Sequence, residues 1–136
     1  MQGSEAAIAI ISATNNTNVH VFHLDLSSRR SAVSFASKVE EKFGFVDVLI
    51  NNAAIAPKKK KLDSNKVEMM FSVNVLGYHN MMVAFQPLLK KSKAAEHHPR
   101  IVNGETSHCY YITATTLLLL QHSHNLLDFE FTVCFL

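Results

Sequence analysis

The chain contains few of the residues that build phosphate-binding loops and disulfide frameworks. Its 136 residues include four glycines, no two within one helical turn of each other. A glycine-rich loop that cradles a pyrophosphate with backbone amides therefore cannot be written anywhere in it. Two cysteines, Cys109 and Cys134, do not make a disulfide framework, and we expect both to stay reduced. The glycines are Gly3, Gly44, Gly77 and Gly104.

The chain also has a small net charge and no long apolar run. A formal net charge of +2 gives no reason to expect nucleic acid or an anionic membrane as a partner. No apolar run approaches the ~18 residues of a membrane-spanning helix, and residues 1–5 lack the basic and then apolar order of a secretory signal. With 48% hydrophobic and 18% charged residues, the composition is globular. We therefore expect one domain at most, in the cytoplasm.

The most informative part of the chain is an apolar strand that ends on small and polar residues. Residues 47–54 read Asp-Val-Leu-Ile-Asn-Asn-Ala-Ala, and a short β-branched run at residues 19–24 is followed by Asp25. In open α/β sheets, ligands bind beyond the carboxyl ends of the strands. These two strand ends indicate a cofactor-binding α/β fold.

Together with Asn74, these strand ends resemble the short-chain dehydrogenase/reductase family. In that family the strand-4 motif reads Asn-Asn-Ala-Gly, an Asp ends strand 3, and a helix carries an Asn of the catalytic set. Asp25, Asn74 and residues 51–53 match position by position, whereas Ala54 departs from the usual Gly. The resemblance covers about residues 4–103. It predicts an incomplete Rossmann-like doubly wound parallel sheet with strands 3, 4 and the start of strand 5, cut at both ends.

The resemblance also implies a chemistry. Family members are NAD(P)-dependent oxidoreductases that act on a small-molecule alcohol or carbonyl, and residues 23–27 and 100–103 resemble the retinol dehydrogenase-like branch. The expected cofactor is NAD or NADP, with the Asp after strand 3 beside the adenine ring. The cofactor-binding positions carried over are Asp25, Leu26, Asn51, Asn52, Ala53 and Ala54.

The catalytic pair of the family, Tyr-x-x-x-Lys, is missing from these residues. The Lys lowers the pKa of the Tyr, normally near 10, so that the phenol can act as an acid or base at neutral pH. No lysine follows Lys93, and no tyrosine has one four positions later. An ungapped continuation of the pattern would place the catalytic Ser near Thr106 or Ser107. We therefore expect catalytic inactivity. The tyrosines and the residues four positions later are Tyr78 with Met82, Tyr110 with Ala114, and Tyr111 with Thr115.

Periodicity predicts the elements that carry these motifs. Apolar residues recur every three or four positions at residues 5–12 and 30–43, which predicts helices, the second capped by residues 25–28 and stopped by Gly44. The run at 45–50 is nearly all apolar, as in a strand covered by helices on both faces. The predicted strands are residues 19–24, 45–50 and, beginning at residue 100, a third.

A long helix is predicted after a loop that contains Pro57 and four lysines. Asp63 or Ser64 would cap it, and Asn74 falls on its apolar stripe. A buried amide costs about 1–3 kcal/mol unless its donors and acceptors are paired, so Asn74 needs a reason to be there. Two interpretations stay open. In the resembled family this Asn holds a water for proton relay, whereas an ordinary core Asn would bond a nearby backbone carbonyl.

The order of strands raises a structural question. We divide the chain into a partial Rossmann-like domain, residues 1–103, and a divergent tail, residues 104–136, with no sustained helical or strand pattern. In the doubly wound order, strands 1 and 2 lie between strands 3 and 4, which would leave a gap of roughly 14 Å. We expect the 19–24 strand to move beside the 45–50 strand. Filling by another chain, or a loose first segment, are the alternatives.

The remaining features are weaker. We interpret Lys58–Lys61 as a solvated loop, with a nuclear signal or a phosphate patch as alternatives. Eight histidines lack partners at known zinc spacings, so no metal site is predicted. Besides the oxidoreductase reading, two alternatives remain: a non-catalytic partner of a full-length relative, associating through exposed strand edges, and a truncated product with no function.

Overall fold

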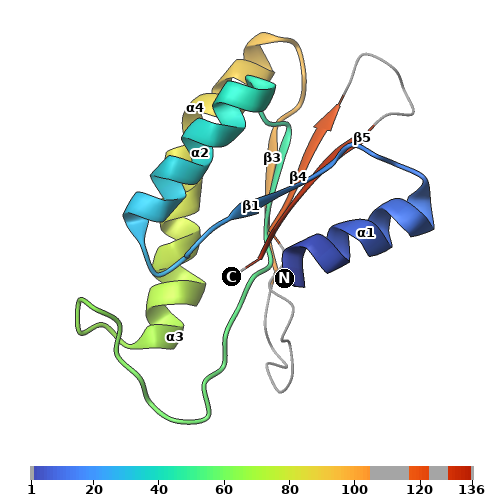
Figure 1. Cartoon of the computed structure of the whole chain (residues 1–136). Coiled ribbons are helices and arrows are strands. Elements are labelled where there is room, and N and C mark those ends of the chain that lie inside the picture. The colour runs from blue at the N-terminus through green and yellow to red at the C-terminus, as the bar shows by residue number, and fades with distance from the viewer. Residues whose placement is uncertain (1, 105–116, 123–128, 136) are drawn as a thin grey trace.

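The computed structural model describes residues 2–104, 117–122 and 129–135, which form helices around one sheet (Figure 1). The helices are α1 (Gln2–Thr14), α2 (Arg29–Phe43), α3 (Met69–Phe71) and α4 (Tyr78–Ala94), and a π-helical segment η1 (Ser72–Gly77) joins α3 to α4. The strands are β1 (Val19–His23), β2 (Val48–Asn51), β3 (Arg100–Asn103), β4 (Leu117–His122) and β5 (Phe129–Phe135).

The sheet has the strand order β1-β5-β4-β2-β3. β1 is parallel to β5 and β2 is parallel to β3, whereas β4 runs antiparallel to both of its neighbours, β2 and β5. The pairing places Val19 beside Phe131 and Leu49 beside Leu119. The β4–β5 pair therefore separates the two strands that carry the sequence motifs.

The expectation that the 19–24 strand would move beside the 45–50 strand is wrong. β5 and β4, from the later part of the same chain, lie between β1 and β2. They provide the backbone hydrogen-bond partners that β1 and β2 need, so these two strands do not have to pair with each other. The tail, in which we saw no sustained pattern, contains both strands. Residues 117–120 are a continuous run of leucine, which is typical of a strand inside a sheet as well as of a buried helix, so periodicity alone could not decide.

Helices lie on both sides of the sheet (Figure 1). α2 packs against α4 on one side, and α1 contacts β1 and β5 on the other. We expect from the sequence a strand covered by helices on both faces, and the structure differs. Leu49 of β2 is fully buried but Val48 and Ile50 are half-buried, so one face of β2 is covered less than the other. The core under α2 and α4 includes Leu24, Leu26, Phe35, Val39, Leu49, Met81, Phe85 and Leu88.

The caps of α2 follow the sequence prediction. The Ser28 side chain accepts a hydrogen bond from the Ser31 backbone N–H at 3.3 Å, which satisfies a free donor of the first turn. At the other end, Gly44 has a φ of 80°, and its N–H donates to the Glu40 carbonyl at 2.8 Å. Glycine is favoured there because it reaches the left-handed region without steric cost.

The predicted start of the long helix is wrong. Asp63 does not cap it, since the Asp63 Oδ1 atom closes a turn by accepting from the backbone N–H groups of Asn65 and Val67. The helix begins six residues later, at Met69, and the Glu68 carboxylate caps it by accepting from the Phe71 N–H at 2.9 Å. A carboxylate at this position also interacts favourably with the helix dipole.

Candidate functional site

The residues singled out from the sequence meet at one edge of the sheet. Asp25 and Leu26 follow β1, Asn51 ends β2 and leads into Asn52–Ala54, and Asn74 lies on η1. β1, β2 and β3 all point their carboxyl ends to this edge, since β2 and β3 are parallel and β1 is linked to them through the antiparallel β4 and β5. The structure therefore brings all the predicted positions to one side of the sheet.

Asn51 locks β2 to β3 at this edge. Its side chain is fully buried, and its Nδ2 atom donates to the Asn103 Oδ1 atom at 2.8 Å. The Asn51 carbonyl accepts from the Gly104 N–H at 2.8 Å. A Cβ on Gly104 would lie 2.5 Å from the Asn52 Oδ1 atom, so these two loop starts are closely packed. The Asn51 Nδ2 group is therefore used within the sheet, whereas its buried Oδ1 atom has no hydrogen-bond partner among the described residues.

The Asn74 amide holds the loop after β2. Its Oδ1 atom accepts from the Ile55 N–H at 2.9 Å, and its Nδ2 atom donates to the Ile55 carbonyl at 3.0 Å. Both hydrogen bonds join the Asn74 side chain to the backbone of the same residue, Ile55, and together they fix the orientation of the Asn74 amide. Of the two interpretations left open, the structure shows an amide that bonds a nearby backbone carbonyl, on a half-buried rather than a core side chain. The role in proton relay stays a prediction.

Asp25 and Leu26 lie in opposite environments. The Asp25 side chain is exposed, and its Oδ1 atom accepts from the Ser27 N–H at 2.9 Å and from the Ser27 Oγ–H at 2.7 Å. Leu26 is buried in the core, as are Ala53 and Ala54. A ligand at this edge could therefore meet the Asp25 carboxylate directly, but could meet the other three only at their backbone.

η1 connects the loops after β1 and β2. A Cβ on Gly77 would lie 2.8 Å from the Leu26 carbonyl oxygen, so the helix approaches that loop as closely as glycine allows. Three residues earlier, Asn74 bonds Ile55. The two predicted binding loops are thus held by a single helical segment, which explains why Gly77 and Asn74 lie within one turn of each other.

One carboxyl group near η1 has a shifted pKa. Asp63 Oδ2 accepts a hydrogen bond of 2.6 Å from the Ser72 hydroxyl. This bond, followed by the bond from the Val67 backbone, holds the pKa of Asp63 below its ordinary value of 3.8, with a smaller opposing effect of desolvation. The charged form of Asp63 therefore stabilises the turn that leads into α3.

A second polar cluster lies near the opposite end of the strands, at the amino end of β2. Sequence reasoning did not find it. The Asp47 Oδ1 atom accepts from the Ser92 hydroxyl at 2.5 Å and lies 2.9 Å from the His97 Nδ1 atom. Ser92 thus donates to the carboxylate rather than to the imidazole, which is not the arrangement of an activated nucleophile. The cluster ties the segment before β2 to the end of α4.

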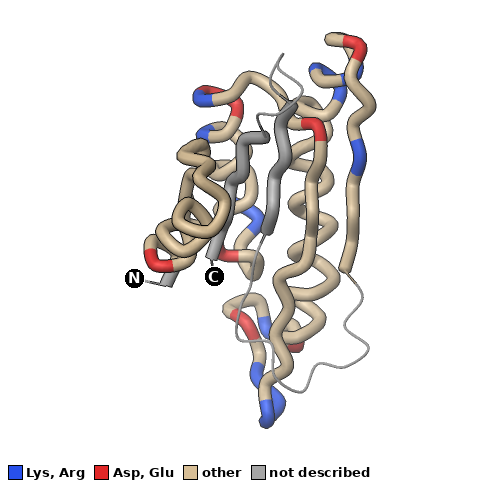
Figure 2. Tube along the Cα trace, turned by 90° about the vertical axis from the view of Figure 1, so that its right-hand side faces the viewer, with Lys and Arg blue, Asp and Glu red and all other residues tan. Residues whose placement is uncertain are grey.

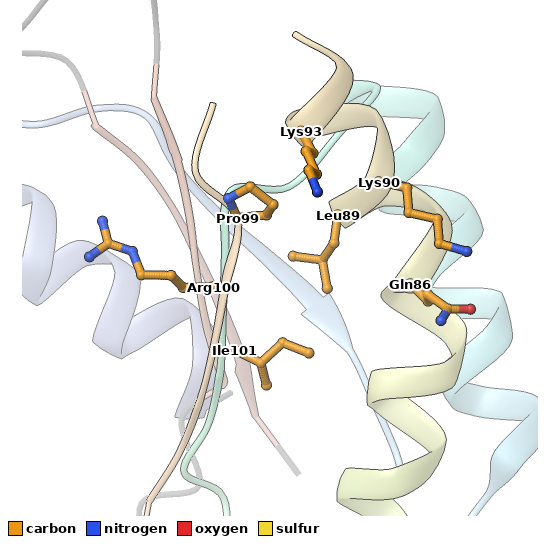
Figure 3. Close-up of a pocket in the computed structure, with 7 residues that line it drawn as sticks. All are labelled: Gln86, Leu89, Lys90, Lys93, Pro99, Arg100 and Ile101. Carbon is orange, nitrogen blue, oxygen red and sulfur yellow. The ribbon is translucent and has the colours of Figure 1, made fainter. Parts of the chain in front are cut away.

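A small pocket of about 230 Å³ lies between the end of α4 and the start of β3. Figure 3 shows the Leu89 and Ile101 side chains extending into the space between helix and strand, whereas Arg100 extends to the other side of β3. Cofactor sites usually occupy about 300–1,000 Å³. The pocket adjoins the amino end of β3, so it is separate from the edge described above. Its lining is Gln86, Leu89, Lys90, Lys93, Pro99, Arg100 and Ile101.

The described residues contain neither a candidate metal site nor a helix that could span a membrane. In residues 2–104, 117–122 and 129–135, no group of three or more His, Cys, Asp and Glu side chains is placed to hold a metal ion. In the same ranges, no helix has both the length and the apolar character needed to cross a bilayer. Thr106 and Ser107, the positions assigned to the catalytic Ser, lie outside the described residues.

The cofactor that the resemblance implies fits only part of this edge. The exposed Asp25 carboxylate is available for an adenosine group. In the doubly wound order, strand 1 lies beside strand 4 and its carboxyl end leads into the glycine-rich phosphate loop. Here β4 takes that place beside β2 and runs antiparallel, so its carboxyl end is at the opposite edge. The exposed Asp25 carboxylate is thus an acceptor that an adenosine group could use, whereas the direction of β4 offers no start for a pyrophosphate-binding loop.

Comparison with known proteins adds a family match. A family model described as short chain dehydrogenase matches residues 2–107. The chain is 35% identical over 105 residues to a short-chain dehydrogenase of Penicillium roqueforti, covering 74% of this chain and 40% of that protein. It is 38% identical over 104 residues to retinol dehydrogenase 13 of Homo sapiens, covering 76% of this chain and 30% of that protein.

A solved structure of a dehydrogenase is also similar to this chain in sequence and in fold. An alcohol dehydrogenase from the archaeon Thermococcus sibiricus, in complex with 5-hydroxy-NADP, is 33% identical with a TM-score of 0.51. The match covers 65% of this chain and 38% of that one. The chain thus spans well under half the length of each of these three proteins. The matched part includes β1, β2, β3 and the helices between them.

Proposed function

Because the chain belongs to the short-chain dehydrogenase family, we propose that its 136 residues keep the adenosine side of an NAD(P) site without completing a site for hydride transfer. The observation that carries this proposal is the antiparallel β4 in the place of the family's strand 1. A phosphate loop needs a strand whose carboxyl end reaches the cofactor edge. Neither that strand direction nor a glycine-rich sequence is available here.

The proposal assigns roles to residues of this chain. The exposed Asp25 carboxylate would accept a hydrogen bond from the adenosine, and the backbone of Asn52–Ala54 would line its other side. Asn74 would position that backbone through Ile55. NAD or NADP, when bound, supplies the hydride acceptor or donor for an alcohol or carbonyl substrate. The family's proton-transfer pair, Tyr-x-x-x-Lys, is absent from these residues, so we propose that they are inactive by themselves.

The decisive experiment compares fragments of the cofactor. We expect the purified chain to bind AMP weakly in isothermal titration calorimetry. NADH and NADPH should bind with dissociation constants within about threefold of that for AMP, because the pyrophosphate and nicotinamide find no partners. Asp25→Asn should weaken all three, whereas Glu41→Gln, an exposed change on α2, should not. NADPH binding about tenfold or more tighter than AMP, or turnover of an alcohol, would refute the proposal.

A second function is favoured by the free edge of β3. β3 ends the sheet order, and its Ile101 and Val102 side chains are 41% and 46% exposed. The Arg100 and Gly104 N–H groups point to β2, so by strand alternation the Ile101 and Asn103 N–H groups point outward. An edge with free backbone groups and apolar side chains can accept a strand from another chain. This arrangement supports association with a full-length relative.

Sedimentation velocity of mixtures with full-length retinol dehydrogenase 13 tests the second function. A heterocomplex is expected if β3 accepts a strand. Ile101→Lys should remove it, since a charged residue on an edge strand opposes pairing. Val83→Lys, at a 50% exposed position of α4, is the matched control and should leave it intact. Independent sedimentation of the two unmodified proteins would exclude this function.

A further inference from the structure

The loop after β2 forms a projecting end of the molecule that is both basic and apolar. Lys58–Lys61 are all exposed, and Figure 2 shows this run of blue at the lower tip of the chain. Beside it, Leu62, Met70 and Phe71 are exposed by 53%, 45% and 49%. We call residues 58–62 with Met70 and Phe71 the basic tip. Large exposed apolar side chains beside a run of lysines are more than an ordinary solvated loop requires.

Backbone contacts hold the basic tip together. The Lys61 carbonyl accepts from the Met69 N–H at 2.9 Å, and Leu62 forms a bridge with Glu68. Lys61, the last lysine of the run, thus bonds Met69, and the exposed Met70 and Phe71 are the next two residues of α3. The lysines and the exposed apolar side chains are thus presented together by one closed turn.

The positive charge of the tip is not neutralised within the described chain. Residues 58–71 contain five lysines and two acidic residues, Asp63 and Glu68. Both carboxylates accept hydrogen bonds from nearby backbone N–H groups. In the part of the chain that the structure describes, the ion pairs are Lys91 with Glu40 and His97 with Asp47, so none of the four consecutive lysines is paired there.

We propose that the basic tip docks on the surface of an anionic lipid bilayer. Lysines near such a surface are attracted by its negative potential, by about fivefold in affinity for each lysine. The exposed Leu62, Met70 and Phe71 supply apolar groups that can enter the headgroup region, as in other peripheral anchors. A nucleic acid would satisfy the lysines but leave Leu62 and Met70 without a role. The net charge of +2 hides this local concentration, which is why composition gave no sign of it.

Vesicle co-sedimentation of the intact chain tests the proposal. We expect binding to phosphatidylcholine vesicles containing about 30% phosphatidylserine at about 0.1 M salt, and release at about 0.5 M salt. The variant K58Q/K59Q/K60Q/K61Q should bind at least about a hundredfold more weakly. L62S/F71S should also weaken binding, by about tenfold or more, because it removes the inserted groups and keeps the charge.

A matched control removes the same charge elsewhere. The variant K38Q/K42Q/K90Q/K93Q changes four exposed lysines of α2 and α4 and should lose much less affinity than the tip variant. Circular dichroism of each variant checks the fold. Equal losses in the two quadruple variants would mean nonspecific attraction and overturn the proposal. So would absence of vesicle binding, or tighter binding to duplex DNA or RNA that L62S/F71S leaves unchanged.

Discussion

At Gly77, the helical segment that carries Asn74 lies in close contact with the loop after β1. An added Cβ would lie 2.8 Å from the Leu26 carbonyl oxygen and 3.0 Å from the Leu26 Cβ atom. The oxygen belongs to backbone, so it cannot turn aside as a long side chain would. The helix must therefore shift if any side chain is introduced at this position.

We predict that Gly77→Ala destabilises the fold. Alanine in a helix should gain up to about 1 kcal/mol over glycine, but overpacking against backbone typically costs about 1–3 kcal/mol, so the net change should be a loss. A thermal melt followed by circular dichroism measures it. Val83→Ala, at an exposed position of α4, serves as the control and should change the midpoint little. A higher midpoint for Gly77→Ala would contradict the close contact.

Asp63 should make stability depend on pH. Its pKa in the folded chain is below the ordinary 3.8, chiefly because of the Ser72 hydroxyl. The stabilisation is therefore fully present above the ordinary value and is lost as pH falls through the lower folded value. Urea unfolding from pH 6 to pH 2.5 should show a smaller acid loss for Asp63→Asn than for the unmodified chain. Asp25→Asn is the comparison, and identical pH profiles for Asp63→Asn and the unmodified chain would refute the assignment.

At the scale of residues, the sequence indicated candidate positions that lie together in the fold, but it did not indicate their contacts. Asp25, Asn51–Ala54 and Asn74 were recognised by type and spacing, and they do share one edge of the sheet. That Asn74 bonds Ile55 could not be foreseen, because the two are nineteen positions apart in the sequence, with a loop and α3 between them. The Asp47, Ser92 and His97 cluster was missed for a similar reason, since its members are brought together only by α4 and β2.

At the scale of elements, periodicity predicted helices and strands correctly where the helical or the strand pattern was clear. α2 and its Gly44 stop follow the prediction closely, and β3 begins at residue 100 as expected. The start of α3 was misplaced because Asp63 has the chemistry of a cap and is used in a turn instead. Cap residues and turn residues are the same types, so the choice between them depends on the following backbone.

Central and edge strands should respond differently to proline. Leu119 of β4 has a register partner on each side, Thr132 in β5 and Leu49 in β2, so its N–H faces a neighbouring strand. Leu119→Pro should therefore remove a ladder bond and abolish cooperative unfolding in a urea titration. Ile101→Pro, in the edge strand β3 at a position whose N–H points outward, should keep a cooperative transition. If both variants unfold alike, the central position of β4 is incorrect.

At the scale of the whole molecule, the strand order could not be read from the sequence. The family resemblance correctly indicated a gap between the first two strands, but it gave no information on residues that it does not cover. An antiparallel pair of strands inserted between the two, with β5 parallel to β1 and β4 antiparallel to β2, has no counterpart in the resembled pattern. Strand pairing also depends on partners that are far away in sequence. The gap was thus predictable and its filling was not.

Removal of residues 104–136 should show how much the sheet depends on its centre. Without β4 and β5, β1 and β2 would each lose the backbone partners that now lie between them. We expect the shortened chain to melt without a cooperative transition and to bind a hydrophobic dye such as ANS. The full chain is the control. A cooperative melt in the shortened chain would mean that β1 can pair directly with β2 after all.

The pairing of β1 with β5 also has a consequence for the order of events during synthesis. Val19 must wait for Phe131, so β1 leaves the ribosome long before the strand that becomes its neighbour. Contacts between residues so distant in sequence slow folding and leave early segments uncovered in the meantime. Until the last strand emerges, the nascent chain should present β1 as a substrate for chaperones.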